Sequence, residues 1–182
     1  LELFLPVGGI SEVGTLIINH KSPLGEFSQS CIRGKKGYPC SKCWKCFRKG
    51  MLSSALLGTE FDIKNYTVKN KEVKEKLSAY PISHENVLVF SIQNLKNRED
   101  KNLQLLRDRI DSGLDLDFLK RWYSPSLELI PEKYRITVEK KIDEFLDVMT
   151  SKEERILENW DMEDFLLKKT TKDAHGRLKA SF

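Results

Sequence analysis

All four cysteines of the 182-residue chain lie in one stretch, Cys31-Ile-Arg-Gly-Lys-Lys-Gly-Tyr-Pro-Cys40-Ser-Lys-Cys43-Trp-Lys-Cys46. Their spacing is C-x8-C-x2-C-x2-C. The two overlapping C-x2-C steps place three thiolates within reach of one ion, and a cysteine from the preceding loop completes a tetrahedron. Gly34, Gly37 and Pro39 provide the sharp turns that this loop requires. The pattern predicts a structural Zn²⁺ bound by Cys31, Cys40, Cys43 and Cys46.

Two other uses of cysteine compete with zinc. Four cysteines can form two disulfides, and a C-x2-C pair can be redox-active, but a disulfide framework usually connects distant parts of a small secreted chain. Here the cysteines span sixteen residues and leave the rest of the chain unconnected. An iron–sulfur cluster also accepts four cysteines and stays open as an alternative.

The charge around the cysteines is strongly positive. No Asp or Glu occurs from Ser28 to Thr59, whereas seven Lys and Arg residues do. Cations near a zinc tetrathiolate offset its net negative charge, and some of them can also contact an anionic ligand such as a nucleotide phosphate. The residues that we predict for such contacts are Arg33, Lys35, Lys36 and Arg48.

The composition indicates a soluble protein rather than a membrane protein. Hydrophobic residues make up 40% of the chain and charged residues 32%, with a net charge of +4. No apolar run reaches membrane-spanning length, and no signal peptide is recognisable. Clustered cysteines without a secretion signal predict a cytoplasmic location.

The chain is expected to divide into three parts. Residues 1–58 would begin with a strand over Leu1–Leu5, followed by a helix capped by Ser11 and another from about Lys42 to Leu57. A strand cannot stand alone, so we expect residues upstream of Leu1 or a partner chain to complete its sheet. Residues 59–169 are expected to be helical, and residues 170–182 to form a flexible tail.

The periodicity of the apolar residues places the helices of this second part. The expected helices cover residues 68–79, 82–95, 99–111, 115–123, 132–149 and 151–160, with a last short one from residue 161. Val87–Phe90 could also form a strand, but the spacing of Leu88, Ile92 and Leu95 favours a buried helix. No P-loop, G-x-S-x-G or H-E-x-x-H motif occurs in this chain, so catalytic residues remain unknown.

Residues 3–58 resemble the C-terminal end of the 7-cyano-7-deazaguanine synthases, the QueC-like branch of the N-type ATP pyrophosphatases. The similarity comprises the strand–Pro–turn, the Ser-capped helix, the Ser30-Cys31 entry, the cysteine spacing and the helix that follows. It implies a structural zinc on Cys31, Cys40, Cys43 and Cys46. It also implies a ligase that uses ATP and Mg²⁺ to activate a deazapurine-type carboxylate for amide and then nitrile formation.

This chain departs from the family in several places. The S-G-G-x-D-S phosphate loop is absent, Ser28-Gln29-Ser30 replaces the usual Thr-Trp-Ser, and Trp44 and Lys45 occupy positions that are usually small or acidic. More than 130 residues follow Cys46. The expected fold class is therefore an α/β remnant: the C-terminal edge of a parallel-sheet domain with its zinc loop, followed by a mainly helical region. Some divergent QueC-like proteins belong to bacterial anti-phage systems, and a large helical region would suit a partner-binding role of that kind.

Two non-enzymatic functions compete with the ligase. In one, the zinc loop binds nucleic acid, with Arg33, Lys35 and Lys36 on phosphates and Tyr38 or Trp44 stacked on bases. In the other, zinc only stabilises a loop of a helical scaffold. We rank the ligase first because of the cysteine spacing. Among possible partners, nucleic acid is less favoured than a protein.

Overall fold

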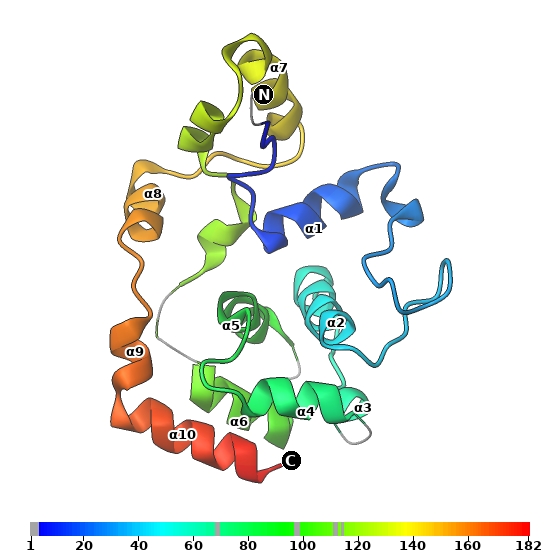
Figure 1. Ribbon diagram of the computed structural model, residues 1–182, viewed down its shortest axis with the longest axis vertical. Helices are drawn as coiled ribbons and strands as arrows, with labels where there is room; N and C mark the ends of the chain where they lie inside the picture. Colours follow the sequence, from blue (N-terminus) through cyan, green and yellow to red (C-terminus); the bar gives the residue numbers. More distant parts are fainter. Residues whose placement is uncertain (1–3, 68–69, 97–98, 111–112, 114) are drawn as a thin grey trace. The chain divides into compact units, whose positions relative to one another are not determined.

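The computed structural model describes residues 4–67, 70–96, 99–110, 113 and 115–182, which form two compact units (Figure 1). The first unit combines Leu1–Ser28 with Asp117–Trp160, and the second combines Gln29–Leu116 with Asp161–Phe182. The boundary expected at residue 58 lies inside the second unit. It is not a domain boundary, because the helices on its two sides, α2 and α5, pack against each other.

Each unit is built from short helices. The first contains α1 (Glu12–Lys21), η1 (Gly25–Phe27), η2 (Asp117–Lys120), η3 (Ser124–Leu129), α7 (Glu132–Asp143) and α8 (Ser151–Glu158). The second contains α2 (Trp44–Leu57), α3 (Lys64–Thr67), α4 (Lys71–Ser78), α5 (Glu85–Asn94), α6 (Lys101–Ile110), α9 (Glu163–Leu167) and α10 (Lys169–Ala180).

The expected α/β remnant is wrong, because the described residues contain helices, turns and isolated backbone bridges but no β-strand. Most of the strand expected over Leu1–Leu5 lies outside the described residues. At its end the Gly8 N–H donates to the Leu5 carbonyl (3.1 Å), so the chain turns there instead of running on. The side chain of Phe4 is 48% exposed, unlike that of a buried strand. No parallel-sheet edge is therefore present among the residues that the structure describes.

Trp122 organises the first unit. Its indole is buried, and its N–H donates to Asp143 Oδ1 (3.2 Å). Its backbone N–H donates to the Asp147 carbonyl (3.0 Å), and its carbonyl accepts from the Met149 N–H (3.0 Å). This pairing requires extended backbone at both partners. It explains why the helices expected over 115–123 and 132–149 are shorter than the apolar pattern predicts.

The core of the second unit lies between α2 and α5. The apolar side of α2 buries Phe47, Met51, Leu52 and Ala55, as its helical spacing predicts. The segment Val87–Phe90 belongs to α5 and is buried, so the helix expected over 82–95 is confirmed and a strand there is excluded.

The expected flexible tail is wrong. Residues Lys169–Ala180 form α10, which packs against α6 and α4. Its buried residues recur at helical spacing: Thr171, Ala174, His175 and Leu178. The polar composition and Gly176 concealed this stripe, although the i, i+3, i+4, i+7 pattern is present in the sequence.

A buried polar network holds α10 to α5 and α6. Arg109 is fully buried and forms a two-pronged ion pair with Glu85, with N–O distances of 2.7 and 3.1 Å. Its Nε–H donates to His175 Nδ1 (3.1 Å), which requires a neutral ring with the proton on Nε2. That Nε2 lies 3.1 Å from the Ser78 carbonyl. The guanidinium of Arg109 also lies over the Tyr80 ring.

None of the helices in the described ranges combines the length and the apolar character that crossing a lipid bilayer requires.

Replacing Arg109 by Met is expected to lower the free energy of unfolding by about 3–5 kcal/mol, because Glu85 is left buried without a counter-charge. Urea denaturation measures this loss. The matched control is Arg177→Met on the exposed side of α10, which should stay near wild type. Adding Glu85→Gln to Arg109→Met should restore part of the stability. Equal stability of all these variants would contradict a structural role for the pair.

Acidification is expected to destabilise the protein through His175. Burial lowers its pKa below the usual 6.5, and the positive charges of Arg109 and Lys179 act in the same direction, whereas the Ser78 carbonyl and Glu85 oppose them. The unfolded chain therefore binds a proton before the folded chain does, so stability falls as pH drops below about 6.5. His175→Gln should flatten this dependence in urea denaturation between pH 5 and 8, and His20→Gln should not.

Candidate metal centre

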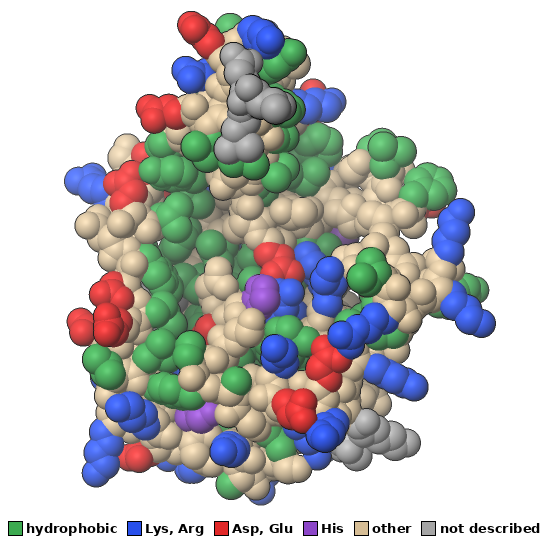
Figure 2. All heavy atoms as spheres, in the orientation of Figure 1, with side chains coloured by type: hydrophobic (Ala, Val, Ile, Leu, Met, Phe, Trp, Pro, Cys, Tyr) green, Lys and Arg blue, Asp and Glu red, His purple; other side chains and the backbone are tan. Residues whose placement is uncertain are grey.

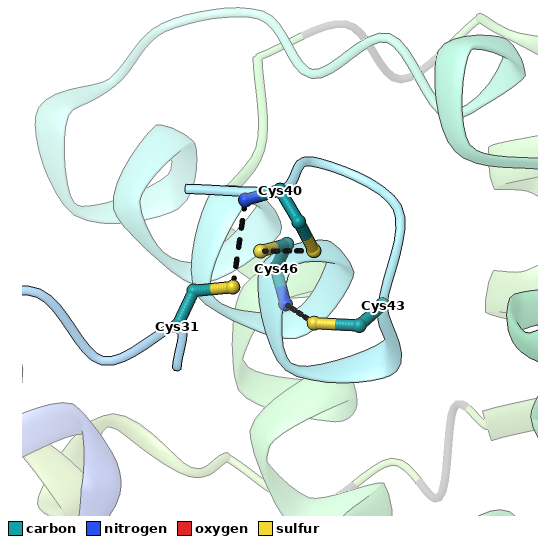
Figure 3. A group of neighbouring side chains, drawn as sticks. All are labelled: Cys31, Cys40, Cys43 and Cys46. Atoms are coloured by element: carbon teal, nitrogen blue, oxygen red, sulfur yellow. Dashed lines mark hydrogen bonds between the residues drawn. The ribbon is translucent and has the colours of Figure 1, made fainter. Parts of the chain in front are cut away.

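The four cysteines meet at one point of the second unit. Their sulfur atoms all lie within 4.8 Å of one another, and Figure 3 shows them pointing toward a common centre. The Sγ atoms of Cys40 and Cys46 are 3.7 Å apart. A tetrahedral ion with metal–sulfur bonds of about 2.3 Å places its ligands about 3.8 Å apart. The cluster therefore has nearly the dimensions of a single-ion site.

The helix that carries two of the ligands starts at the cluster itself. Cys43 is the N-cap of α2, and its Sγ accepts from the backbone N–H of Cys46 (3.5 Å), one turn into the helix. The helix begins at Trp44 rather than at Lys42, because Ser41 has a left-handed backbone (φ 52°) and Cys43 an extended one. The positive end of the helix dipole faces the thiolates.

Gln29 holds the loop that supplies the other two ligands. Its Nε2 donates to the Cys31 carbonyl (2.7 Å), and its Oε1 accepts from the Gly37 N–H (2.7 Å). The Tyr38 N–H closes a tight turn on the Lys35 carbonyl (2.9 Å). Gly37 occupies a left-handed position (φ 78°) that favours glycine. This turn returns the chain so that the Cys40 N–H reaches Cys31 Sγ (3.4 Å).

The thiols differ in acidity. The Cys40 N–H is the main cause that lowers the pKa of Cys31 to about 6. Burial is the main cause that raises the pKa of Cys46 to about 12. A buried thiol of this kind becomes a thiolate at neutral pH when a cation coordinates it. The donor set thus fits a positively charged ion.

The distances between the sulfur atoms disfavour both disulfide bonds and a multi-iron cluster. All four are free thiols, and 3.7 Å is far beyond the roughly 2.05 Å of a disulfide bond. A multi-iron cluster places its own iron and sulfide atoms between the thiolates and so needs a wider arrangement. The four cysteines can therefore hold one metal ion such as zinc, with no ligand position left open for substrate.

An aromatic cluster supports the metal centre from within the core. Trp44 stacks on Phe47 (centroids 5.2 Å apart), and Phe61 stacks on Tyr66 (5.3 Å). Tyr66 packs against the cysteines, and burial raises the pKa of its hydroxyl. Trp44 is 6% exposed, so it is a core residue and cannot stack on a base, which leaves Tyr38 as the other residue expected for that contact.

Glu72 of α4 and Asn70, the N-cap of α4, hold the cysteine loop, and no sequence pattern indicated either of them. The Glu72 carboxylate accepts from the Trp44 backbone N–H (3.1 Å) and pairs with Arg33. The Trp44 N–H is the main cause of the lowered pKa of Glu72. Asn70 caps α4 with its oxygen and donates from its amide to the Lys42 carbonyl. These contacts join residues 28 to 39 positions apart, which no local pattern predicts.

The four predicted phosphate contacts lie in three different settings. Lys35 and Lys36 are exposed on the tight turn. Arg33 is exposed but engaged by Glu72. Arg48 is buried within α2, so it is not placed to reach an anionic ligand in solvent. The structure therefore keeps Lys35 and Lys36 together on one accessible surface and separates Arg48 from them.

Fold and site together define a mainly helical protein with a cluster of four cysteines that can hold a metal ion. The chain belongs to a family described as a family of unknown function (DUF6395), whose model matches residues 1–161. The match covers most of both units and ends before α9 and α10. Neither a search of curated proteins nor a search of solved structures found a match.

The purified protein is expected to contain one metal ion per chain, measured by elemental mass spectrometry. Cys43→Ser or Cys46→Ser should abolish tight binding, because each removes a buried ligand, whereas Ser41→Ala between the ligands should not. Chelation should speed hydrogen exchange at the Cys40 and Cys46 amides, which the cluster orders. A wild-type protein without metal, or serine variants that retain it, would overturn the assignment.

Proposed function

We propose that the metal is zinc and that its role is structural. Four thiolates form a closed tetrahedral shell, the arrangement of structural rather than catalytic zinc. Three of the four cysteines are buried, and no ligand position is left for a substrate. A cytoplasmic location, where thiols stay reduced, suits such a site.

We further propose that the chain is part of a QueC-like, ATP-dependent ligase acting on a deazapurine-type or related carboxylate. The observation that carries this proposal is the C-x8-C-x2-C-x2-C spacing, folded as a closed cluster at the start of α2. The Ser30-Cys31 entry and the Ser11-capped α1 also match the expected order. The described residues contain no β-strand, so the sheet of such a ligase would lie outside them.

In this reaction the substrate carboxylate attacks the α-phosphorus of ATP and pyrophosphate leaves. Ammonia then attacks the acyl adenylate, and AMP leaves to give an amide. The amide oxygen would then attack a second ATP with loss of pyrophosphate, and departure of AMP with that oxygen, together with loss of a proton from nitrogen, would give the nitrile. This chain has no S-G-G-x-D-S loop, so ATP and Mg²⁺ would bind residues outside it. The helices after α2 would hold a partner protein, as in an anti-phage defence system.

The complete protein should release pyrophosphate from ATP when a deazapurine carboxylate and ammonia are supplied. Intact mass of the denatured protein first shows whether residues beyond these 182 are present. Pyrophosphate release is then measured for wild type and for Cys43→Ser, which should be inactive because the zinc loop is lost. The exposed variant Lys152→Ala serves as the control. An intact, zinc-loaded complete protein that releases no pyrophosphate with any carboxylate tested would exclude the ligase.

A further inference from the structure

The cysteine loop presents an accessible basic surface with an aromatic side chain. We call Ile32, Arg33, Lys35, Lys36 and Tyr38 the basic turn. Tyr38 is 76% exposed and Ile32 93% exposed, so both side chains are accessible to a ligand. In Figure 1 the loop between η1 and α2 leaves the helices as a narrow hairpin, and Figure 2 shows Lys and Arg side chains spread over one face of the molecule.

The basic turn is held in one shape before any ligand arrives. Gln29 bonds to the backbone at both sides of it, and the Tyr38 N–H closes it on the Lys35 carbonyl. The cysteines fix its two ends at the metal centre. A ligand that binds here therefore does not have to order a flexible loop, which would otherwise weaken binding.

The charge of the turn is not neutralised by its own segment. The nearest acidic residues in the sequence are Glu26 and Glu60, on either side of the loop and α2. Glu72 reaches the turn from α4, but its carboxylate is already engaged by Arg33 and the Trp44 N–H. Lys35 and Lys36 thus face solvent beside an exposed ring. A polyanion with flat, stackable groups complements this surface.

We propose that the basic turn binds single-stranded nucleic acid. Lys35 and Lys36 contact phosphates, and the Tyr38 ring stacks on a base, in the combination of cationic groove and aromatic platform that sequence-tolerant binding uses. An anionic membrane fits less well, because the tip of the turn is Lys36-Gly37 and the only exposed aliphatic side chain of the basic turn is Ile32. A charged tip would have to enter the lipid first.

This inference does not depend on the ligase, because it needs only the folded cysteine loop. The two proposals therefore fail separately. Loss of pyrophosphate release leaves nucleic-acid binding standing, and absence of nucleic-acid binding leaves the ligase standing.

The test is fluorescence anisotropy of the full protein with fluorescein-labelled oligo-U and oligo-dT twelve-mers. Two phosphate contacts on a single strand predict a loss of about sevenfold in affinity between 50 and 200 mM salt. Tyr38→Ala should lower the affinity for both oligonucleotides at least about fivefold. Tyr38→Phe should bind them like wild type, because it keeps the aromatic ring. The double variant Lys35→Glu, Lys36→Glu should lower the affinity further, and its remaining affinity should change less with salt concentration. The control is Lys168→Glu, Lys169→Glu, which makes the same change in net charge on α10.

Zinc content is measured for every variant, so that loss of binding is not confused with loss of the loop. If the lysine variant loses its metal, the comparison of Tyr38→Ala with Tyr38→Phe still shows whether the aromatic ring contributes to nucleic-acid binding. Three results would overturn the proposal: no binding by wild type at 50 mM salt, equal binding by Tyr38→Ala, or equal loss in the α10 control. Co-sedimentation with phosphatidylserine vesicles but no binding of either oligonucleotide would instead identify a membrane surface.

Discussion

The second unit depends on the convergence of four thiols at one point. That convergence fixes where α2 begins, since Cys43 caps the helix and Cys46 lies in its first turn. It also sets the length of the loop, because Cys31 and Cys40 must return to the same place. The aromatic residues beneath it and the acidic and amide groups of α4 around it are arranged to support this cluster. A metal ion such as zinc can hold the thiols together where repulsion between thiolates would drive them apart.

Helix α4 connects this cluster to the second buried polar site of the unit. At its N-terminal end Asn70 and Glu72 bond to the backbone of Lys42 and Trp44, beside the cysteines. At its C-terminal end the Ser78 carbonyl meets His175, which also accepts from Arg109. A short helix with a modest apolar face is thus held by hydrogen bonds at both ends. The arrangement makes the cysteine loop and the Arg109 network parts of one structure, although their residues are far apart in the sequence.

The two roles that we propose for the cysteine loop, a structural zinc site in a ligase and a nucleic-acid surface, place different demands on it. A structural zinc needs only the closed shell of cysteines, whereas ligand binding needs the outer side of the loop to remain exposed. The structure meets both conditions, because the sulfurs face inward and Lys35, Lys36 and Tyr38 are exposed. Arg48, which the sequence grouped with them, belongs to the inner face. Arg48 lies three residues before Met51 and four before Leu52, so the helical spacing of α2 places it on the buried side, and only its charge suggested contact with an anionic ligand.

The sequence by itself determined the cysteine cluster, since four cysteines within sixteen residues can reach one another through local turns. It also determined the helices with a regular apolar stripe, such as α2 and α5. Only the tertiary structure decided the rest. Backbone pairing at Trp122 shortened two expected helices, and packing against α6 ordered the polar segment that became α10. Long-range contacts from Glu72 and Arg109 follow no local pattern. Their partners are chosen by how whole helices pack, and packing depends on the entire chain at once.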